Sequence, residues 1–241
     1  MIRLFCGFDP REAAAYHVFA QSVIECSTVP VALIPLHLGM LSGFDGRRDG
    51  SNDFGFSRYL IPSLCQFSGW AIFCDGDMLC REDLAELWKL RDERFAIQVV
   101  KHDYKTKHPY KYTGTPMVAS NVDYPRKNQS SVMLWFCGHP ANAVLTREFV
   151  TDSGASFLHR FEWLKEEQIG GLPIKWNHLV REYPLEPASI AHFTLGVPGF
   201  PHYRDDDYAQ EWAQTYLRAV NLIGENPLSV TRRALEDSDN G

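Results

Sequence analysis

The chain has 241 residues, 45% of them hydrophobic, which is enough to bury one sizeable core. Its formal net charge is -6 and the sequence has no long cluster of lysine and arginine, so nucleic acid is not an expected partner. No apolar segment approaches the roughly 20 residues that cross a bilayer, and the amino terminus reads directly as a strand rather than as a signal peptide. We therefore predict a globular cytoplasmic protein without a transmembrane segment.

The opening of the chain predicts a strand, a helix and a second strand. Residues 2–8 form an apolar run, and Asp9 followed by Pro10 is a typical helix entry. Apolar residues then recur at helical spacing as far as Cys26, and residues 31–36 read as the next strand. This order is typical of a doubly wound, mostly parallel sheet, which binds its ligands at the carboxyl ends of its strands.

The remaining elements follow in the same alternating order. We predict helices at 57–67, 83–88, 156–167 and 207–223, and strands at 70–74, 95–100, 130–136 and 190–194. Residues 172–177 read as an extended segment. Polar residues 39–55 predict a long mobile loop or a partly ordered flap, and residues 101–127 predict an irregular excursion or short hairpin over the active face. We predict one domain over residues 1–235 and a polar, disordered tail over 236–241.

The six cysteines show no Cys-x-x-Cys spacing, and several lie within apolar runs. A cysteine in such a run behaves as a small hydrophobic residue. We predict buried reduced thiols rather than zinc ligands or disulfides.

An acidic turn is the strongest chemical signal. The apolar run at 70–74 stops at Asp75-Gly76-Asp77, and the next predicted element is a helix, which places the pair in a βα turn. Asp and Gly are also ordinary turn residues. Two like charges beside a hydrophobic strand end nevertheless repel unless something positive neutralises them, and a hard divalent cation is the simplest candidate.

Several motifs in collinear order resemble the family-eight-like glycosyltransferases, which have a GT-A fold. The matching segments are Ser57-Arg58-Tyr59-Leu60-Ile61-Pro62, residues 70–77, residues 83–88, Ser130-Ser131-Val132-Met133-Leu134, residues 172–177 and His192-Phe193-Thr194-Leu195-Gly196. The resemblance implies a single-domain, Rossmann-like mixed and mostly parallel sheet flanked by helices. It also implies a retaining hexosyltransferase that uses a nucleotide-diphosphate sugar as donor and a glycan or other hydroxyl-bearing molecule as acceptor.

The resemblance further implies Mn²⁺ or Mg²⁺ held by Asp75, Asp77 and His192. An imidazole ligand shifts the preference toward Mn²⁺. Asp75 in this motif can instead reach the ribose or a metal-bound water, and a histidine after an apolar strand can be purely structural. Arg58 is expected beside the phosphate or sugar of the donor, which suits its planar guanidinium, although it can also be a solvated helix cation.

The other candidate residues are assigned by place in the chain. Donor contacts are expected from Phe8, Asp9, Arg11 and Tyr16 toward the base and ribose, and from Asn128, Ser130 and Ser131 toward the sugar. Asp9 is equally explained as a helix N-cap. By resemblance, Trp176 and Asn177 are expected on the acceptor side.

The sequence departs from the family pattern in three places. Gln129-Ser130-Ser131 replaces an Asn or Asp, a small residue and Gly, which leaves the donor sugar open. The lysine that follows the family's late histidine is missing, and the candidate replacements are Lys127, Lys175 and Arg204. An Asp-Gln-Asp segment is also missing. In its approximate region Glu162 and Glu166, four residues apart, are candidate catalytic carboxylates or a solvated helix face.

Two other classes of function remain open from the sequence. Residues 73–77 also resemble the nucleophile motif of haloacid-dehalogenase-like phosphatases, although Met78-Leu79 stands where that family has Gly-Thr or Gly-Val. A non-catalytic module that binds a nucleotide sugar or a glycan is the third interpretation.

Overall fold

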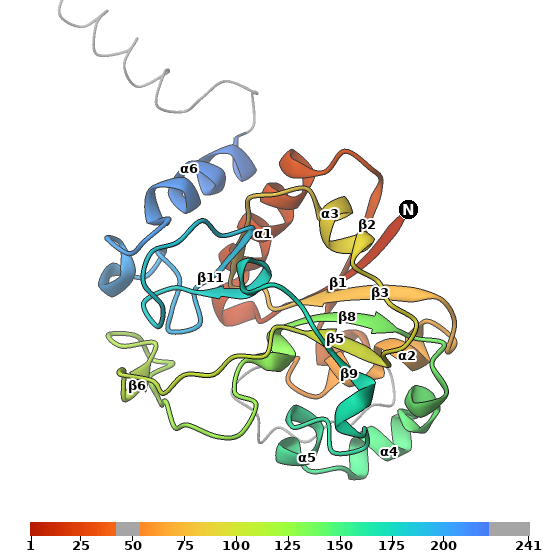
Figure 1. The fold of residues 1–241 in the computed structure, drawn as a ribbon. Helices are drawn as coiled ribbons and strands as arrows, with labels where there is room; N and C mark the ends of the chain where they lie inside the picture. The colour runs from red at the N-terminus through yellow and green to blue at the C-terminus, as the bar shows by residue number, and fades with distance from the viewer. Residues whose placement is uncertain (42–53, 222–241) are drawn as a thin grey trace, which may run out of the picture.

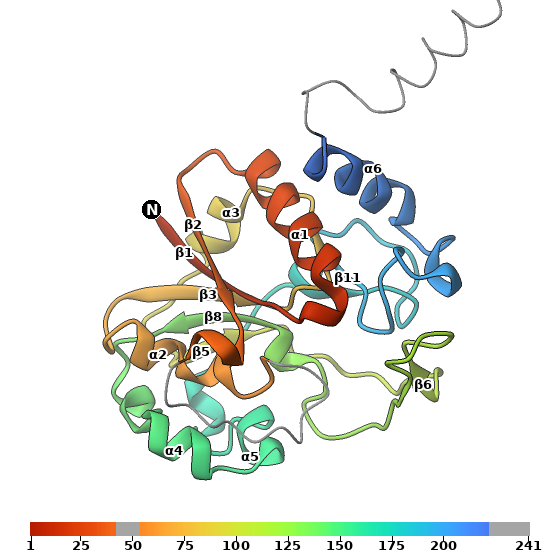
Figure 2. The same cartoon turned by 180° about the vertical axis from the view of Figure 1, so that it is seen from behind.

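The structure is a computed structural model that describes residues 1–41 and 54–221. A central sheet carries helices on both faces, with α1 and α3 on one face and α2, α4 and α5 on the other (Figures 1 and 2). The helices are α1 (Ala13–Cys26), α2 (Ile61–Leu64), α3 (Leu84–Lys89), α4 (Arg147–Asp152), α5 (Ala155–His159) and α6 (Ala209–Ala219). Most of the predicted loop at 39–55 and the whole of the predicted tail at 236–241 lie outside the described residues.

The main sheet has the strand order β2-β1-β3-β8-β5-β9. Its strands are β1 (Ile2–Gly7), β2 (Val31–Leu36), β3 (Trp70–Cys74), β5 (Ile97–Val99), β8 (Val132–Phe136) and β9 (Ile169–Gly171). The pairs β1–β2, β1–β3 and β5–β9 are parallel, whereas β8 runs antiparallel to both β3 and β5. The predicted mixed, mostly parallel α/β sheet is therefore confirmed.

The strands read as continuous apolar runs because both faces of the sheet are covered. Along β3, Phe73 packs into the core beneath the sheet with Trp135, and Ile72 packs into the opposite core with Leu134. Successive side chains of a strand point to opposite faces, so a strand between two helical layers buries all of them. This burial fixes the place at which β3 ends and the acidic turn begins.

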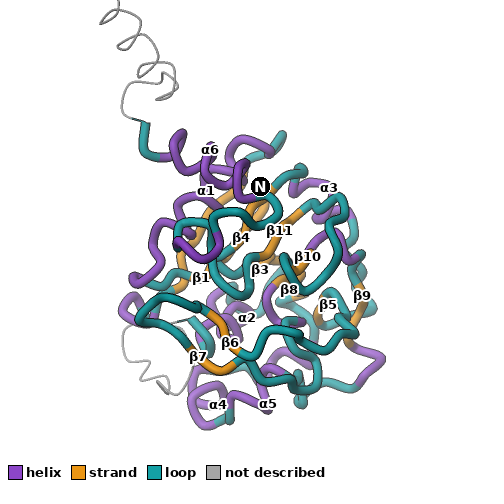
Figure 3. Tube along the Cα trace, turned by 90° about the vertical axis from the view of Figure 1, so that its left-hand side faces the viewer, coloured by secondary structure: helices purple, strands orange, loops and turns teal. Residues whose placement is uncertain are grey.

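The acidic turn lies between two strands, and its prediction as a βα turn is wrong. After Asp75-Gly76-Asp77 the chain forms β4 (Met78–Cys80), which joins a second sheet of order β10-β11-β4 (Figure 3). The other strands of this sheet are β10 (His178–Leu179) and β11 (Ile190–His192). Gly76 is required here because a Cβ atom would lie 2.3 Å from the carbonyl oxygen of Gly7. The turn thus passes directly against the end of β1.

Three predicted helices are shorter than expected, and part of the predicted extended segment at 172–177 is a turn. The segment 57–67 contains a 3-10 turn at Ser57–Leu60 followed by the single turn of α2, and the final helix ends at Ala219. In the segment 156–167 the α-helix ends at His159, before Phe161 with its left-handed φ of 54°, and only a 3-10 turn at Glu166–Gln168 follows. Residues 172–177 are not extended throughout, since Ile174–Asn177 forms a 3-10 turn.

Residues 101–127 form the predicted excursion. It contains a short antiparallel hairpin of β6 (Tyr110–Lys111) and β7 (Ala119–Ser120), which stands apart from the main sheet (Figure 3). All six cysteines are free, and five of them are buried. Among the described residues, no helix is both long and apolar enough to cross a membrane.

Candidate active site

Strand pairing brings the late histidine to the acidic turn. His192 pairs with Met78 across β11 and β4, and the amide of Phe193 donates to the carbonyl of Asp77 at 2.9 Å. The Nε2 atom of His192 consequently lies 3.3 Å from Oδ1 of Asp77 and 4.0 Å from Oδ2 of Asp75. One ligand atom from each of these three residues lies within 4.8 Å of the others. Carboxylate oxygens and an imidazole nitrogen are ligands of divalent cations, and here they lie close enough together to share one.

Asn177 sets the tautomer of His192. The Nδ2 amide group of Asn177 faces Oγ of Ser131 at 2.9 Å, the carbonyl of Asn128 at 3.1 Å and Nε2 of His102 at 3.0 Å. Its Oδ1 therefore faces Nδ1 of His192 at 2.9 Å and accepts that proton. The Nε2 atom then faces the aspartates, and its lone pair is available to a cation bound there, as in a metal-binding histidine oriented from behind.

The two aspartates differ in their charge environment. Burial raises the pKa of Asp75 to about 6, with Asp77 adding to the rise and Arg58 opposing it. Burial also disfavours the charged form of Asp77, but the neighbouring His192 outweighs it and lowers the pKa of that carboxyl. Oδ1 of Asp77 is buried and accepts no hydrogen bond from the described residues. A cation bound between the two carboxylates would satisfy this atom and favour both ionised forms.

Arg58 is held rigidly on the other side of Asp75. Its Nη1 lies 2.9 Å from Oδ1 of Asp75 and 2.8 Å from the carbonyl of Ser130, while its guanidinium packs over the rings of Phe54 and Phe73. The residue is only 3% exposed, so it is not a solvated helix cation. Its other terminal nitrogen, Nη2, makes no hydrogen bond to the described residues and remains available to a ligand.

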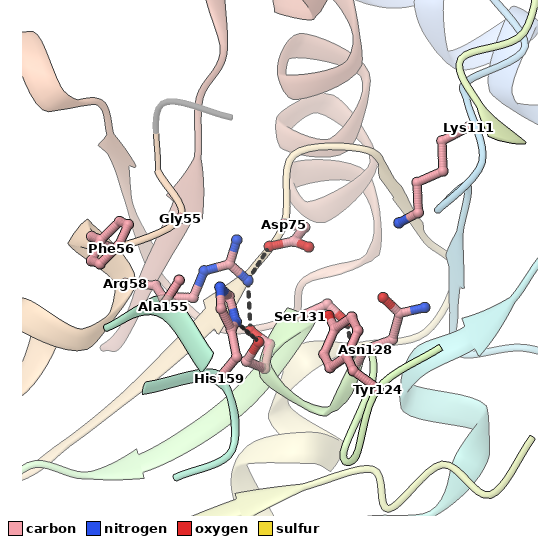
Figure 4. Close-up of a pocket in the computed structure, with 11 residues that line it drawn as sticks. Gly55, Phe56, Arg58, Asp75, Lys111, Tyr124, Asn128, Ser131, Ala155 and His159 are labelled. Atoms are coloured by element: carbon pink, nitrogen blue, oxygen red, sulfur yellow. Dashed lines mark hydrogen bonds and ion pairs between the residues drawn. The ribbon is translucent and has the colours of Figure 1, made fainter. Parts of the chain in front are cut away.

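A polar cavity of ≈ 110 Å³ opens beside these groups (Figure 4). Its lining includes Arg58, Asp75, Lys111, Asn128, Ser130, Ser131 and His159. Nδ1 of His159 lies 2.8 Å from both the Tyr59 hydroxyl and Oγ of Ser130, and burial lowers the pKa of His159 to about 3. His159 is therefore neutral near pH 7. The structure thus brings the three predicted sugar-contact residues into one cavity with Arg58 and Asp75.

The residues predicted for the base and ribose follow β1 as expected. Phe8 packs edge-on against Tyr16, with ring centroids 5.4 Å apart. Asp9 accepts a hydrogen bond from the amide of Arg11 and pairs with its guanidinium, so capping already accounts for its conformation. Their role in donor binding stays a prediction.

The two residues expected on the acceptor side are both buried. Trp176 is 1% exposed and packs in a hydrophobic core, and Asn177 is fully buried behind His192. Their surroundings are those of structural and positioning residues, and an acceptor role stays a prediction.

The structure does not bring Glu162 and Glu166 to the cluster of Asp75, Asp77 and His192. The predicted shared helix face of these glutamates is wrong, because Glu162 follows the end of α5. Glu162 lies 3.7 Å from Arg160, and Glu166 forms salt bridges with Lys101 and Arg126 at the surface. The interpretation as solvated side chains therefore fits both.

Sequence reasoning missed Lys111 and His159. Both lie in segments whose apolar periodicity is weak or broken, and neither belongs to a motif of the resemblance. The clustering of His, Lys and aromatic residues within 101–127 was a signal for Lys111, whereas His159 had no such signal.

Comparisons with solved structures identify the fold. The apo structure of the bifunctional glycosyltransferase WbbM superposes with a TM-score of 0.64 at 13% identity, covering 89% of this chain and 49% of that one. The galactosyltransferase LgtC, in complex with donor and acceptor sugar analogs, gives 0.57 at 13% identity, covering 92% and 97%. The glycosyltransferase GlyE of Streptococcus pneumoniae gives 0.58 at 14% identity, covering 90% and 61%. This chain thus spans about half of WbbM and about three fifths of GlyE.

These similarities show that the chain has the GT-A fold of glycosyltransferases. No family model matches the sequence. A curated relative, Protein CDI of Arabidopsis thaliana, is 40% identical over 221 residues, which cover 87% of this chain and 84% of the relative. At this identity and coverage, the chain belongs to the same protein family as Protein CDI.

Proposed function

We propose that this protein is a divalent-metal-dependent glycosyltransferase that transfers a sugar from a nucleotide-diphosphate sugar to a hydroxyl-bearing acceptor. The observation that carries the proposal is the convergence of Asp75, Asp77 and His192 at the end of a GT-A sheet. The buried and unsatisfied carboxylate oxygen of Asp77 supports a cation in this place. Glycosyltransferase neighbours of the same fold favour this chemistry over a phosphatase of the haloacid-dehalogenase type.

Each group has a role that its surroundings support. Asp75, Asp77 and His192 would hold Mn²⁺ or Mg²⁺, which when bound stabilises negative charge on a diphosphate leaving group. Asn177 keeps the Nε2 lone pair of His192 directed at that position. Arg58 offers its free Nη2 to the phosphate or sugar of the donor.

The cavity beside Arg58 is the proposed subsite for the donor sugar. Neutral His159 and the hydroxyls of Ser130 and Ser131 suit the hydroxyl groups of a sugar, since each can donate or accept a hydrogen bond. The structure of LgtC holds donor and acceptor sugar analogs, which supports the same pair of ligands here. The motif order supports retention of anomeric configuration and a single catalytic domain over residues 1–235.

A thermal-shift screen of nucleotide sugars, with Mn²⁺, with Mg²⁺ and with excess chelator, tests the proposal. The donor should raise the melting temperature in the presence of the metal, because a ligand that binds the folded state stabilises it by mass action. The donor found in this way is then incubated with glycan acceptors, and release of the nucleoside diphosphate is followed over time. Nuclear magnetic resonance of the product reports whether the anomeric configuration is retained.

The outcomes separate the candidate functions. Metal-dependent release of nucleoside diphosphate that increases with acceptor supports the transferase. Binding without hydrolysis or transfer would support a non-catalytic nucleotide-sugar module. Cleavage of a simple aryl phosphate, with no response to any nucleotide sugar, would overturn the proposal in favour of a phosphatase.

A further inference from the structure

Lys111 is a cation that faces the acidic cluster without a carboxylate partner of its own. It lies on β6 and lines the same cavity as Arg58 and Asp75, and the two cations reach toward Asp75 from opposite sides of the view in Figure 4. Its Nζ donates one hydrogen bond, to Oγ1 of Thr194 at 3.1 Å. Within residues 1–41 and 54–221, no acidic group lies within salt-bridge distance of it.

This arrangement leaves an ammonium group with unused hydrogen-bonding capacity in a polar cavity. An ammonium carries three N–H donors, and Thr194 takes one of them. Burial lowers the pKa of Lys111, and the charges of Asp77 and Asp75 act in the opposite direction. A partly buried cation is stabilised when an anion enters beside it, so the part of the cavity next to Lys111 is suited to a negatively charged ligand.

The hairpin that carries Lys111 is fixed to the body of the protein. The amide of Tyr112 donates to the carbonyl of Leu195 at 2.6 Å, and the amide of Thr113 donates to the hydroxyl of Tyr203 at 2.8 Å. The ring of Tyr112 is buried, at 8% exposure. The backbone that carries Lys111 is consequently held in place before any ligand arrives, which reduces the entropy lost on binding.

The three cations that the sequence offered in place of the missing lysine are either paired with a carboxylate or lie away from the cavity. Lys175 pairs with Glu82 at 2.7 Å, and Lys127 lies 3.3 Å from Asp123. Arg204 is exposed and does not line the cavity. None of these three side chains lines the cavity that Asp75 lines, so none of them faces a ligand bound there as Lys111 does.

We propose that Lys111 binds the diphosphate of the donor, in the role for which the sequence offers no lysine after His192. This inference rests on the proposed function, because it assumes a nucleotide-diphosphate ligand. In the proposed arrangement the diphosphate lies between the cation held by the aspartates and the ammonium of Lys111, with Arg58 on the opposite side. The charge of the diphosphate thereby meets positive groups on several sides.

The test measures binding of metal and of diphosphate separately. Isothermal titration calorimetry with Mn²⁺ alone is followed by titration with uridine, guanosine, adenosine and cytidine diphosphates in the presence of Mn²⁺. The variants are Lys111→Met, which removes the charge, Lys111→Arg, which keeps it, and Lys107→Met as a control. Lys107 is an exposed lysine of the same excursion. Melting temperatures of all variants report whether each is folded.

Lys111→Met is expected to weaken binding of the best nucleoside diphosphate by about 10- to 100-fold, the range for one lost charge-assisted hydrogen bond. The same variant should bind Mn²⁺ as well as the wild type or more tightly, because a competing positive charge has been removed. Lys111→Arg should recover part of the diphosphate affinity, and Lys107→Met should match the wild type. Opposite responses to metal and diphosphate distinguish anion binding from general damage to the site.

Wild-type affinity for diphosphate in a folded Lys111→Met protein would overturn this inference alone. Equal losses for Mn²⁺ and diphosphate would also overturn it, since they would indicate a structural role. If the wild type binds neither Mn²⁺ nor any of the four diphosphates, the proposed function itself fails, and this inference fails with it.

Discussion

The two sides of the site are built in different ways. On one side, strand ends carry Asp75, Asp77 and His192, and strand pairing brings one side-chain atom of each within 4.8 Å of the others. On the other side, Lys111 stands on a two-residue strand of a hairpin that belongs to neither larger sheet. The first side is part of the folded core, whereas a few hydrogen bonds and one buried ring hold the second.

This difference suggests that the strand ends and the hairpin bind different parts of the ligand. A cation is bound best by ligands that cannot move, and strand ends supply that rigidity. A hairpin anchored by Tyr112 can instead change between related proteins without disturbing the proposed metal ligands, because loops tolerate change better than core elements. We therefore expect substitutions at the strand ends to affect metal binding and substitutions in the hairpin to affect anion binding.

Asp77→Ala should have the largest effect on the strand-end side. It removes a buried carboxylate of the proposed metal site, and metal-dependent donor turnover is expected to fall by about 1000-fold or more. Turnover is measured as nucleoside diphosphate released at saturating Mn²⁺. Glu93→Ala, which removes an exposed carboxylate, should retain normal turnover. Wild-type rates in Asp77→Ala would mean that the cluster is not the metal site.

Asn177→Leu should weaken Mn²⁺ binding by about 10- to 100-fold, the usual range for a residue that orients a metal-binding histidine. Leucine leaves Nδ1 of His192 without its acceptor, so the ring loses both its orientation and its tautomer. Asn177→Asp retains an acceptor oxygen and should lose less. Titration of metal-free protein with Mn²⁺ gives the affinities. Equal affinity in the wild type and the leucine variant would show that Asn177 has no orienting role.

The same contrast explains what the sequence could predict. Asp75, Asp77 and His192 follow apolar runs, and such runs predict strands because burial on both faces leaves a continuous pattern. Pattern could not show that β4 continues the chain after the acidic turn, because a three-residue strand is too short to have a periodicity. The sequence therefore predicted that these three residues lie together, as they do, but it placed the two aspartates in a turn of the wrong kind.

The position of Lys111 on the hairpin could not be predicted from the sequence, for a physical reason. Lys111 is positioned through Tyr112 and Thr113, whose partners Leu195 and Tyr203 lie far along the chain. A tertiary contact of this kind leaves no local pattern. Asn177 was expected near an acceptor for a similar reason: its motif marked it as important, but only the fold shows that its amide faces His192.

Tyr112→Ala should release the hairpin and leave the metal site intact. The variant removes a buried ring, so we expect diphosphate affinity to fall by about tenfold while Mn²⁺ affinity stays near the wild-type value. The double variant Tyr112→Ala with Lys111→Met should bind diphosphate no more weakly than Lys111→Met alone, because both changes act through one ammonium group. Additive losses in calorimetry would show that Tyr112 contributes independently of Lys111.

Glu12 links the two sides and should make stability depend on pH. Burial, with the charges of Asp77 and Asp9, raises the pKa of Glu12 to about 8, although Tyr112 donates a hydrogen bond to it. The folded protein therefore holds a proton between the ordinary pKa of 4.5 and about 8 that the unfolded chain releases. The free energy of unfolding should consequently fall as the pH rises through this range.

Glu12→Gln imitates the protonated side chain and should remove that part of the pH dependence. Relative to the wild type, the variant should gain stability as the pH rises from 5 to about 8, by on the order of 1 kcal/mol or more. Urea denaturation of metal-free protein at each pH measures the difference, with Glu93→Gln as the exposed control. A difference that does not change with pH would mean that Glu12 is ionised in the fold, and that the contact between hairpin and core tolerates a negative charge.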